Sequence, residues 1–284
     1  MRILITGAAG MLGQDLYEAA INAGHEAVGL ARGELDVTDT GAVRAAVASA
    51  RPDTVINSAA WTDVDGAEAD EAGATLVNGP GAGNVAAAAA EAGAWTIQVS
   101  SDYVFDGTKR EPYLESDPVG PQSAYGRSKL AGEREVARAA PESHTTVRSS
   151  WLFGAGGPCF PRTIERLAAE RDELTVVDDQ VGCPTFTGDL AAALIALAAA
   201  PGGPPVGLIH LAADGECSWF EFATEIVASA ALRCEVKPVP TAAFPRPATR
   251  PAYSVMRSER EAPTLPNWRQ GLSEYMRLTE RAAA

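Results

Sequence analysis

Tyr125 and Lys129 stand four residues apart in the segment Tyr-Gly-Arg-Ser-Lys, and this spacing can build an acid–base pair. In a helix, side chains four residues apart lie on the same face. A phenol with a pKa near ~10 exchanges protons poorly at neutral pH, and a neighbouring ammonium lowers that pKa. The chain has only three lysines against twenty arginines, so a lysine here is a selective choice. The pair alone is a weak signal, because solvated helix faces often carry both residue types.

A glycine-rich turn near the N-terminus supplies a second part of such a site. Residues 2–6 predict a buried strand, residues 14–23 predict a helix, and Gly7, Gly10 and Gly13 lie between them. In this context backbone N–H groups at a helix N-terminus bind a dinucleotide pyrophosphate. Gly7 would permit the tight turn, Gly10 the approach of the diphosphate, and Gly13 close packing of helix on strand. The spacing is G-x-x-G-x-x-G, and a turn without a nucleotide is the alternative.

Ser101 completes the constellation at the end of an expected strand, residues 96–101. In an open parallel sheet, ligands bind outside the carboxyl ends of the strands. A hydroxyl there can donate to a carbonyl oxygen while Tyr125 protonates it, although a serine that caps the next turn is the alternative. The three parts in this order indicate a dehydrogenase site.

Elements that position these residues alternate between strand and helix, which predicts an α/β, Rossmann-like, doubly wound parallel sheet. Further strands are expected at 27–31, 54–57 and 145–148, helices at 42–50, 76–92 and from about 124, and a loop at 102–123.

A second, loop-rich lobe is expected beyond about residue 151, where the pattern becomes irregular. Dense prolines over 238–266 exclude long helices there, and Ser218 with Glu221 predicts a capping box. We therefore assign residues 1–150 to an NAD(P)-binding domain, with possible later return segments. Residues 151–284 are assigned mainly to a smaller C-terminal α/β substrate-binding lobe.

Composition excludes several classes of function. A net charge of −14 argues against a nucleic-acid or anionic-membrane partner. No apolar run approaches ~20 residues, so we expect neither a membrane span nor a signal peptide. The four cysteines are widely spaced and lack metal-type spacing, which predicts reduced thiols in a cytoplasmic protein.

Short motifs along nearly the full chain resemble the extended short-chain dehydrogenase/reductases and, within them, the dTDP-4-dehydrorhamnose reductases. They are TGAAGMLGQ at 6–14, NSAAWTDVD at 57–65, SSDYVFDG at 100–107, YGRSKLAGE at 125–133, RSSW at 148–151, GCPT at 182–185 and Arg-Pro at 250–251. The set in this order is specific. The resemblance implies reduction of the C4 keto group of a dTDP-4-keto-6-deoxysugar by NAD(P)H, taking dTDP-4-dehydro-L-rhamnose to dTDP-L-rhamnose.

The resemblance also implies a role for each matching position. Tyr125 would protonate the keto oxygen, Lys129 would tune it and bond the nicotinamide ribose, and Ser101 would polarise the carbonyl. Asp102 would hold the sugar and Trp151 would pack against it, with simple core packing as the alternative for Trp151. The remaining cofactor-binding positions are Met11 and Leu12 of the pyrophosphate turn, Asp36 and Val37 on the adenine side, and Ala60, Trp61 and Thr62 beside the ribose.

The choice of cofactor depends on the end of the second expected strand. A carboxylate there would bond the ribose 2′-OH of NAD, but none occurs before Glu34. Arg32 can instead pair with the 2′-phosphate of NADP. We predict NADPH, with NADH and a plain surface role for Arg32 left open.

Charged residues outside the motifs bear on the substrate and on assembly. Arg250, with Arg246 and Arg257, is the candidate for binding the substrate diphosphate, and a solvated basic loop is the alternative for the latter two.

Some reductases of this family dimerise through a metal held by acidic side chains. The residues at the matching positions, Asp15 and Gly188 followed by Asp189, depart from that pattern. We therefore predict no metal site and a monomer or weak homodimer.

Four other functions stay open. A different nucleotide-4-ketosugar reductase or an epimerase would share the same core motifs. Dehydratases of this superfamily resemble one another in an Asp-Glu pair directly after the catalytic Ser or Thr. In this chain Ser101 is followed by Asp102 and Tyr103, which argues against a 4,6-dehydratase. A regulatory nucleotide-binding subunit would not require the intact Ser–Tyr–Lys set.

Overall fold

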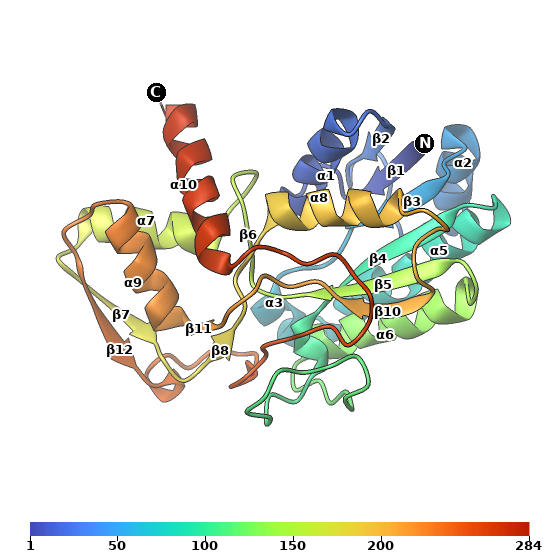
Figure 1. Cartoon of the computed structure of the whole chain (residues 1–284). Helices are drawn as coiled ribbons and strands as arrows, with labels where there is room; N and C mark the ends of the chain where they lie inside the picture. Colours follow the sequence, from blue (N-terminus) through green and yellow to red (C-terminus); the bar gives the residue numbers. More distant parts are fainter. Residues whose placement is uncertain (284) are drawn as a thin grey trace.

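A six-stranded parallel sheet forms the centre of the computed structural model, which describes residues 1–283 (Figure 1). The strand order is β10-β5-β4-β3-β1-β2, so the chain crosses from β1 to one side and then returns to the other. This confirms the Rossmann-like doubly wound fold, whose ligand crevice lies at such a reversal. The strands are β1 Arg2–Thr6, β2 Glu26–Leu30, β3 Thr54–Asn57, β4 Trp95–Ser101, β5 His144–Ser149 and β10 Gly207–His210.

Helices cover both faces of this sheet because alternate side chains of the buried strands point to opposite sides. Ile3 and Ile5 pack in the cluster that contains α1 and α8, whereas Leu4 packs in the opposite cluster with α2 and α5. Helix α6 lies beside α5 and also contacts β4 and β5. The bounds are α1 Met11–Asn22, α2 Thr40–Ala50, α5 Ala82–Glu91, α6 Ala124–Ala139 and α8 Thr187–Ala198.

The single helix predicted over 76–92 is wrong for its first part. The chain forms α3 Val64–Ala69 and α4 Glu71–Leu76, then a π-helical turn over Val77–Gly81, and only then α5. Pro80 within the turn lacks a backbone N–H, which disfavours a regular helix there. The turn is also packed closely by α6, since a Cβ on Gly132 would lie 2.1 Å from the Asn78 carbonyl oxygen.

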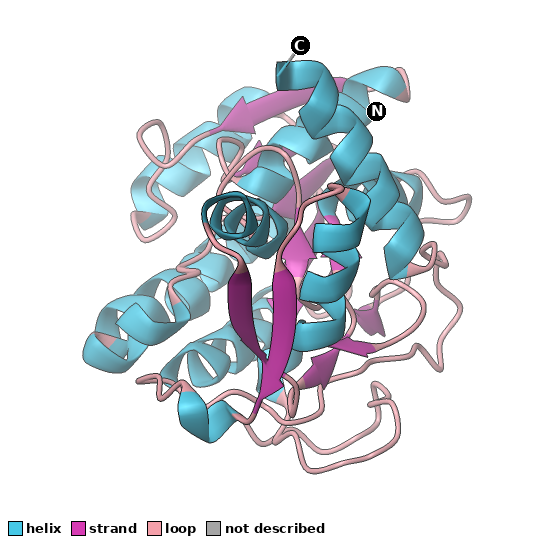
Figure 2. Cartoon of the chain, turned by 90° about the vertical axis from the view of Figure 1, so that its left-hand side faces the viewer, coloured by secondary structure: helices cyan, strands magenta, loops and turns pink. Residues whose placement is uncertain are grey.

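A second lobe surrounds the parallel pair β7 Glu173–Val177 and β12 Glu235–Val239 (Figure 2). Its core is aromatic, with Phe153, Phe222, Trp268 and Tyr275 fully buried. Ser218 and Glu221 form the predicted capping box. The remaining elements of this lobe are α7 Phe160–Glu170, α9 Trp219–Ser229, α10 Trp268–Ala283, β6 Leu152–Phe153 with β9 Thr185–Phe186, and β8 Val181–Gly182 with β11 Cys217–Ser218.

The expectation that regular structure fades beyond residue 151 is wrong for several segments. Helix α8 and strand β10 return to the Rossmann unit, where α8 packs against α1 and β10 pairs with β5 (Figure 1). Helix α8 is apolar almost all round, so it shows no amphipathic period. Within the described part of 238–266, the only helical piece is the 3-10 turn Thr241–Ala243. No helix within residues 1–283 has the length and apolar character to cross a bilayer.

Candidate active site

The start of α6 brings the three predicted catalytic side chains together. Ser123 caps this helix by accepting a hydrogen bond from Gly126 N, which places Tyr125 in the first turn and Lys129 in the second. Lys129 is 5% exposed and its Nζ donates to the Val99 carbonyl at 2.8 Å. Two residues later β4 ends at Ser101, whose hydroxyl lies near enough to the Tyr125 phenol to lower its pKa.

Burial sets the protonation of this group. It raises the pKa of Tyr125 to about 12, against a smaller lowering by Ser101, and it lowers the pKa of Lys129 to about 8. The idea that Lys129 depresses the pKa of the phenol is therefore wrong for the unliganded protein. Desolvation outweighs the charge, and the ammonium is bonded to the Val99 carbonyl. At neutral pH the phenol holds its proton, which is the form that a proton donor needs.

Asp102 follows Ser101 directly and is 2% exposed. Its Oδ1 accepts the Ser101 hydroxyl at 2.9 Å, while its Oδ2 has no well-formed hydrogen bond within the described residues. Burial raises the pKa of this carboxyl to about 6, although the hydroxyls of Ser254 and Ser101 favour the charged form. A buried carboxylate with an uncommitted oxygen beside the catalytic serine can accept a hydroxyl of a sugar.

Asp102→Asn should stabilise the unliganded protein at pH 8. Protonated Asp102 carries no penalty below about pH 4, and the penalty grows as the pH rises through about 6 to roughly 3 kcal/mol. The amide avoids this penalty, so we expect Tm to rise by several degrees at pH 8 and far less at pH 4.5. Thermal denaturation at both pH values, with the exposed Asp172→Asn as control, checks this. An equal gain at both pH values would contradict it.

The glycine turn divides into positions that the fold requires and one that it does not. Gly7 has φ +69°, and a Cβ there would lie 2.7 Å from Ala59 N. A Cβ on Gly13 would lie 2.2 Å from the Gly7 carbonyl oxygen, so α1 packs on the turn only with glycine here. Gly10 is the N-cap of α1, and its Cβ would meet only the Gly7 oxygen, at 3.1 Å.

The exposed end of α1 is suited to a diphosphate. Its first internal hydrogen bond runs from Gln14 N to Gly10 O, so the N–H groups of Met11 and Leu12 have no partner within the helix. Such N–H groups bind anions. The cofactor role of Met11 and Leu12 stays a prediction.

The adenine-side residues lie after β2. Asp36 accepts hydrogen bonds from the backbone N–H and hydroxyl of Thr38, at 2.9 and 2.8 Å, and these bonds lower its pKa. Val37 is buried, and its carbonyl accepts a hydrogen bond from Asn84. Arg32 lies just past the carboxyl end of β2, is exposed, and forms no salt bridge with another described residue, although its charge helps to lower the pKa of Asp36.

The ribose-side loop, Ala60–Trp61–Thr62, is held by Asn78 of the π turn. The Asn78 amide accepts from Trp61 N at 2.8 Å and donates to Trp61 O, and it also donates to Ser128 Oγ on α6 at 2.8 Å. One side chain thus ties the cofactor loop to the helix of Tyr125. Sequence reasoning missed Asn78, and the Gly-Pro-Gly that follows it was the available signal.

Trp151 sits in an aromatic stack. Its φ is +46°, and its ring lies on Trp219 with centroids 3.5 Å apart and planes 3° from parallel. A Cβ at Gly182 would lie 2.4 Å from Trp151 Cε2, so the indole also packs closely against this glycine. Trp219 therefore covers one face of the indole. Sequence reasoning did not identify Trp219.

Arg250 joins the proline-rich segment to the cofactor side. Its two terminal nitrogens donate to the Asp65 carboxylate at 2.8 and 2.9 Å, and Arg246 lies 3.8 Å from the same carboxylate. Arg257 instead donates its backbone N–H to Tyr113. The structure thus brings together two of the three predicted arginines.

The acidic pair Asp15 and Asp189 and a hollow on the surface lie apart from Ser101, Tyr125 and Lys129. Asp15 and Asp189 lie on the packed helices α1 and α8, and burial raises the pKa of both carboxyls. Within residues 1–283, no three His, Cys, Asp or Glu side chains are grouped to hold a metal.

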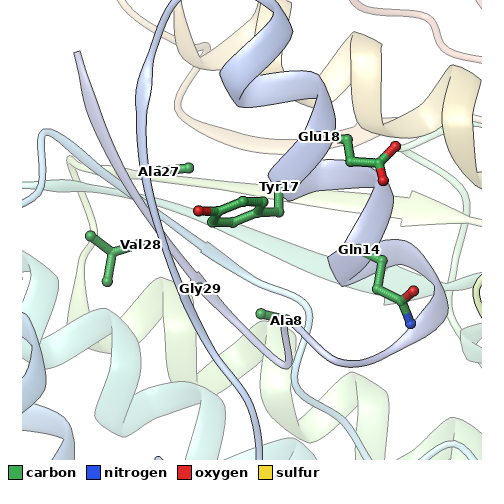
Figure 3. Close-up of a pocket in the computed structure, with 7 residues that line it drawn as sticks. All are labelled: Ala8, Gln14, Tyr17, Glu18, Ala27, Val28 and Gly29. Carbon is green, nitrogen blue, oxygen red and sulfur yellow. The ribbon is translucent and has the colours of Figure 1, made fainter.

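A surface hollow of about 540 Å³ lies between α1 and β2, and none of Ser101, Tyr125 and Lys129 lines it (Figure 3). Its lining is Ala8, Gln14, Tyr17, Glu18, Ala27, Val28 and Gly29.

Comparisons with known proteins agree with this geometry. The family model described as RmlD substrate binding domain matches residues 1–280. The chain is 45% identical over 280 residues to a dTDP-4-dehydrorhamnose reductase of Streptomyces griseus, covering 96% of this chain and 92% of that protein. It is 41% identical over 282 residues to a dTDP-4-keto-6-deoxy-D-glucose reductase of Streptomyces niveus, covering 98% and 97%.

A solved structure adds the cofactor. The dTDP-4-dehydrorhamnose reductase of Bacillus anthracis strain Ames, in complex with NADP, superimposes with a TM-score of 0.92 at 37% identity, covering 98% of this chain and 99% of that one. Sequence match and fold agree over nearly the whole length. The chain belongs to the RmlD family, together with the dTDP-4-dehydrorhamnose reductases.

Proposed function

We propose that this protein reduces the C4 keto group of a dTDP-4-keto-6-deoxysugar with NADPH, and that dTDP-4-dehydro-L-rhamnose is its substrate. The observation that carries the proposal is the Ser101–Tyr125–Lys129 group at the end of β4, in which Ser101 and Lys129 are buried and the partly buried Tyr125 holds its proton at neutral pH. Family membership over nearly the whole chain supports the same reaction.

The chemistry assigns a task to each side chain. Bound NADPH supplies a hydride to the C4 carbonyl carbon. Ser101 and Tyr125 donate hydrogen bonds to the carbonyl oxygen as negative charge develops on it, which stabilises the transition state in a partly dehydrated site. Tyr125 then gives its proton to the oxygen, and the product is an alcohol. Lys129, fixed by Val99 O, would hold positive charge near the phenol and would bond the ribose.

Groups around this centre would hold the rest of the substrate. Asp102 would accept a sugar hydroxyl and Trp151 would contact the sugar ring. Arg250 would face the diphosphate, sharing its charge with Asp65. We propose that residues 151–284, apart from α8 and β10, form the substrate lobe. The four free cysteines suit a cytoplasmic location, and our prediction for assembly stays a monomer or weak homodimer.

Arg32→Ala should raise the KM for NADPH about tenfold and leave the KM for NADH nearly unchanged. The guanidinium at the end of β2 is placed to pair with a 2′-phosphate, and a charged hydrogen bond of this kind contributes roughly 1.5–3 kcal/mol. Steady-state kinetics with each cofactor measure the effect, and the exposed Arg233→Ala serves as a control. Equal losses with both cofactors would assign Arg32 a structural role instead.

The proposed substrate is tested by following NADPH oxidation with dTDP-4-keto-6-deoxyglucose, with and without a 3,5-epimerase. Oxidation only with the epimerase supports dTDP-4-dehydro-L-rhamnose as the substrate. Oxidation without it favours a reductase of the unepimerised sugar, the activity that names the Streptomyces niveus relative. Conversion of a nucleotide sugar with no net NADP⁺ release would indicate an epimerase. Tight NADPH binding without any turnover would favour the regulatory role.

A further inference from the structure

Glu133 lies one helical turn beyond Lys129 on α6. It takes no part in the proposed reaction. Its side chain is 10% exposed and its two oxygens are fully engaged. Oε1 accepts the Ser100 hydroxyl at 2.6 Å and Arg148 Nε at 2.8 Å, while Oε2 accepts Arg148 Nη2 at 2.7 Å. Such a bidentate pair fixes both position and orientation.

These contacts reach the two strands next to the catalytic serine. Ser100 precedes Ser101 on β4, and Arg148 is its register partner on β5. One turn earlier on α6, Lys129 bonds to Val99 O of the same strand. Helix α6 therefore has two consecutive side-chain anchors on two consecutive residues of β4. This pairing sets how far along the strand Tyr125 lies relative to Ser101.

The same contacts define the charge around Lys129. Glu133 is the charged group that favours the ammonium of Lys129, and Arg148 forms an ion pair with this same carboxylate. Arg148 is 3% exposed, lies over the Phe105 ring at 4.9 Å, and has a buried Nη1 without a partner in the described structure. His210 of β10 lies within range of the Arg148 charge, and Asp102, just after β4, raises the pKa of Tyr125 by its charge.

The outer side of Glu133 meets a second set of groups. Arg134 and His144 line, with Glu133, a hollow between α6 and β10. Neither of them is among the groups whose charge shifts the pKa of Lys129.

We propose that Glu133 is a positioning residue of this active site: held by Ser100 and Arg148, its carboxylate fixes α6 against the end of β4 and balances the buried ammonium of Lys129. This deepens the proposed reductase function. It also predicts a property that does not depend on the substrate. Removing the negative charge of Glu133 should lower the pKa of Lys129, and removing the positive charge of Arg148 should raise it.

The test is an NMR titration of protein labelled with 13C at the lysine ε carbon. The chain has only three lysines, and Lys129→Met identifies the signal of Lys129 by its loss. Glu133→Gln keeps the size of the side chain and an acceptor for Ser100, and should lower the titration midpoint of Lys129 by about one pH unit. Arg148→Met should raise it by a similar amount, since the Glu133 charge is then no longer offset.

The pH profile of kcat gives a second readout. The alkaline limb, where Lys129 loses its charge, should move down in Glu133→Gln and up in Arg148→Met. Either single variant leaves a buried charge without its partner, which can prevent folding. The double variant Glu133→Gln/Arg148→Met leaves neither charge, and its midpoint should return toward that of the wild type.

Shifts of the same sign in both single variants, or no shift in a folded single variant, would overturn the proposal and leave the pair as a structural ion pair only. If only the double variant folds, a midpoint within about half a unit of the wild type, with kcat retained within tenfold, supports the positioning role. A midpoint displaced by more than that would overturn it. Absence of reductase activity in the wild type would contradict the proposed function and would leave the NMR result valid.

Discussion

Tyr125→Phe should lower kcat by about 10²–10⁴-fold, because the variant loses the proton that the alkoxide must receive. The ring remains in its place against Tyr103, whose centroid lies 5.4 Å away, so the site keeps its shape. The Kd for NADPH should change by no more than a few-fold, since the hydroxyl faces the substrate carbonyl. Stopped-flow or steady-state oxidation of NADPH measures kcat, and fluorescence titration measures the Kd.

The exposed Tyr17→Phe on α1 is the matched control and should keep kcat within about twofold of the wild type, as surface substitutions generally perturb little. A Tyr125→Phe protein that retains more than a tenth of the wild-type kcat would mean that another group donates the proton. Ser101 would then be the next candidate, because its hydroxyl lies against the phenol.

The sequence was sufficient to predict those elements whose structure depends on residues close together in the chain. The strand, glycine turn and helix at the N-terminus depend on neighbouring residues. Gly7 and Gly13 could be predicted because only a residue without a side chain fits at these two positions. The Tyr–Lys pair is likewise a spacing within one helix. Glu133 has the same four-residue spacing from Lys129, so its place on that face was predictable, but its bond to Arg148 was not.

Contacts between distant segments had no such signal. Arg250 and Asp65 are separated by 185 residues along the chain, and nothing in either segment specifies the other. Trp151 and Trp219 meet because two segments that are far apart in the chain pack together within the second lobe, and neither segment specifies the other. The direction of the Tyr125 pKa depends on burial by the whole fold, so an argument from the adjacent Lys129 alone gave the wrong sign.

Gly13→Ala should abolish measurable NADPH binding and also destabilise the protein. The new Cβ would lie 2.2 Å from the Gly7 carbonyl oxygen and 2.7 Å from Ala8 Cα, and both are backbone atoms that cannot rotate away. Helix α1 must therefore shift from β1, which disturbs its packing on α8. Overpacking of this kind costs about 1–3 kcal/mol, and displacement of the helix N-terminus removes the diphosphate site.

Gly10→Ala separates the two effects of a side chain in this turn. Its Cβ meets only one protein atom, at 3.1 Å, so Tm should fall by no more than about 2–4 °C. It nevertheless occupies the space in front of the helix N-terminus, so the Kd for NADPH should rise by at least about tenfold. Gly157→Ala, whose Cβ would lie 3.6 Å from Met11 Cβ, controls for glycine replacement itself and should change neither quantity. Thermal denaturation and fluorescence titration of the three variants give both values. If Gly10→Ala bound NADPH as the wild type does, the diphosphate would not lie at the start of α1, and Gly13 would be required only for packing.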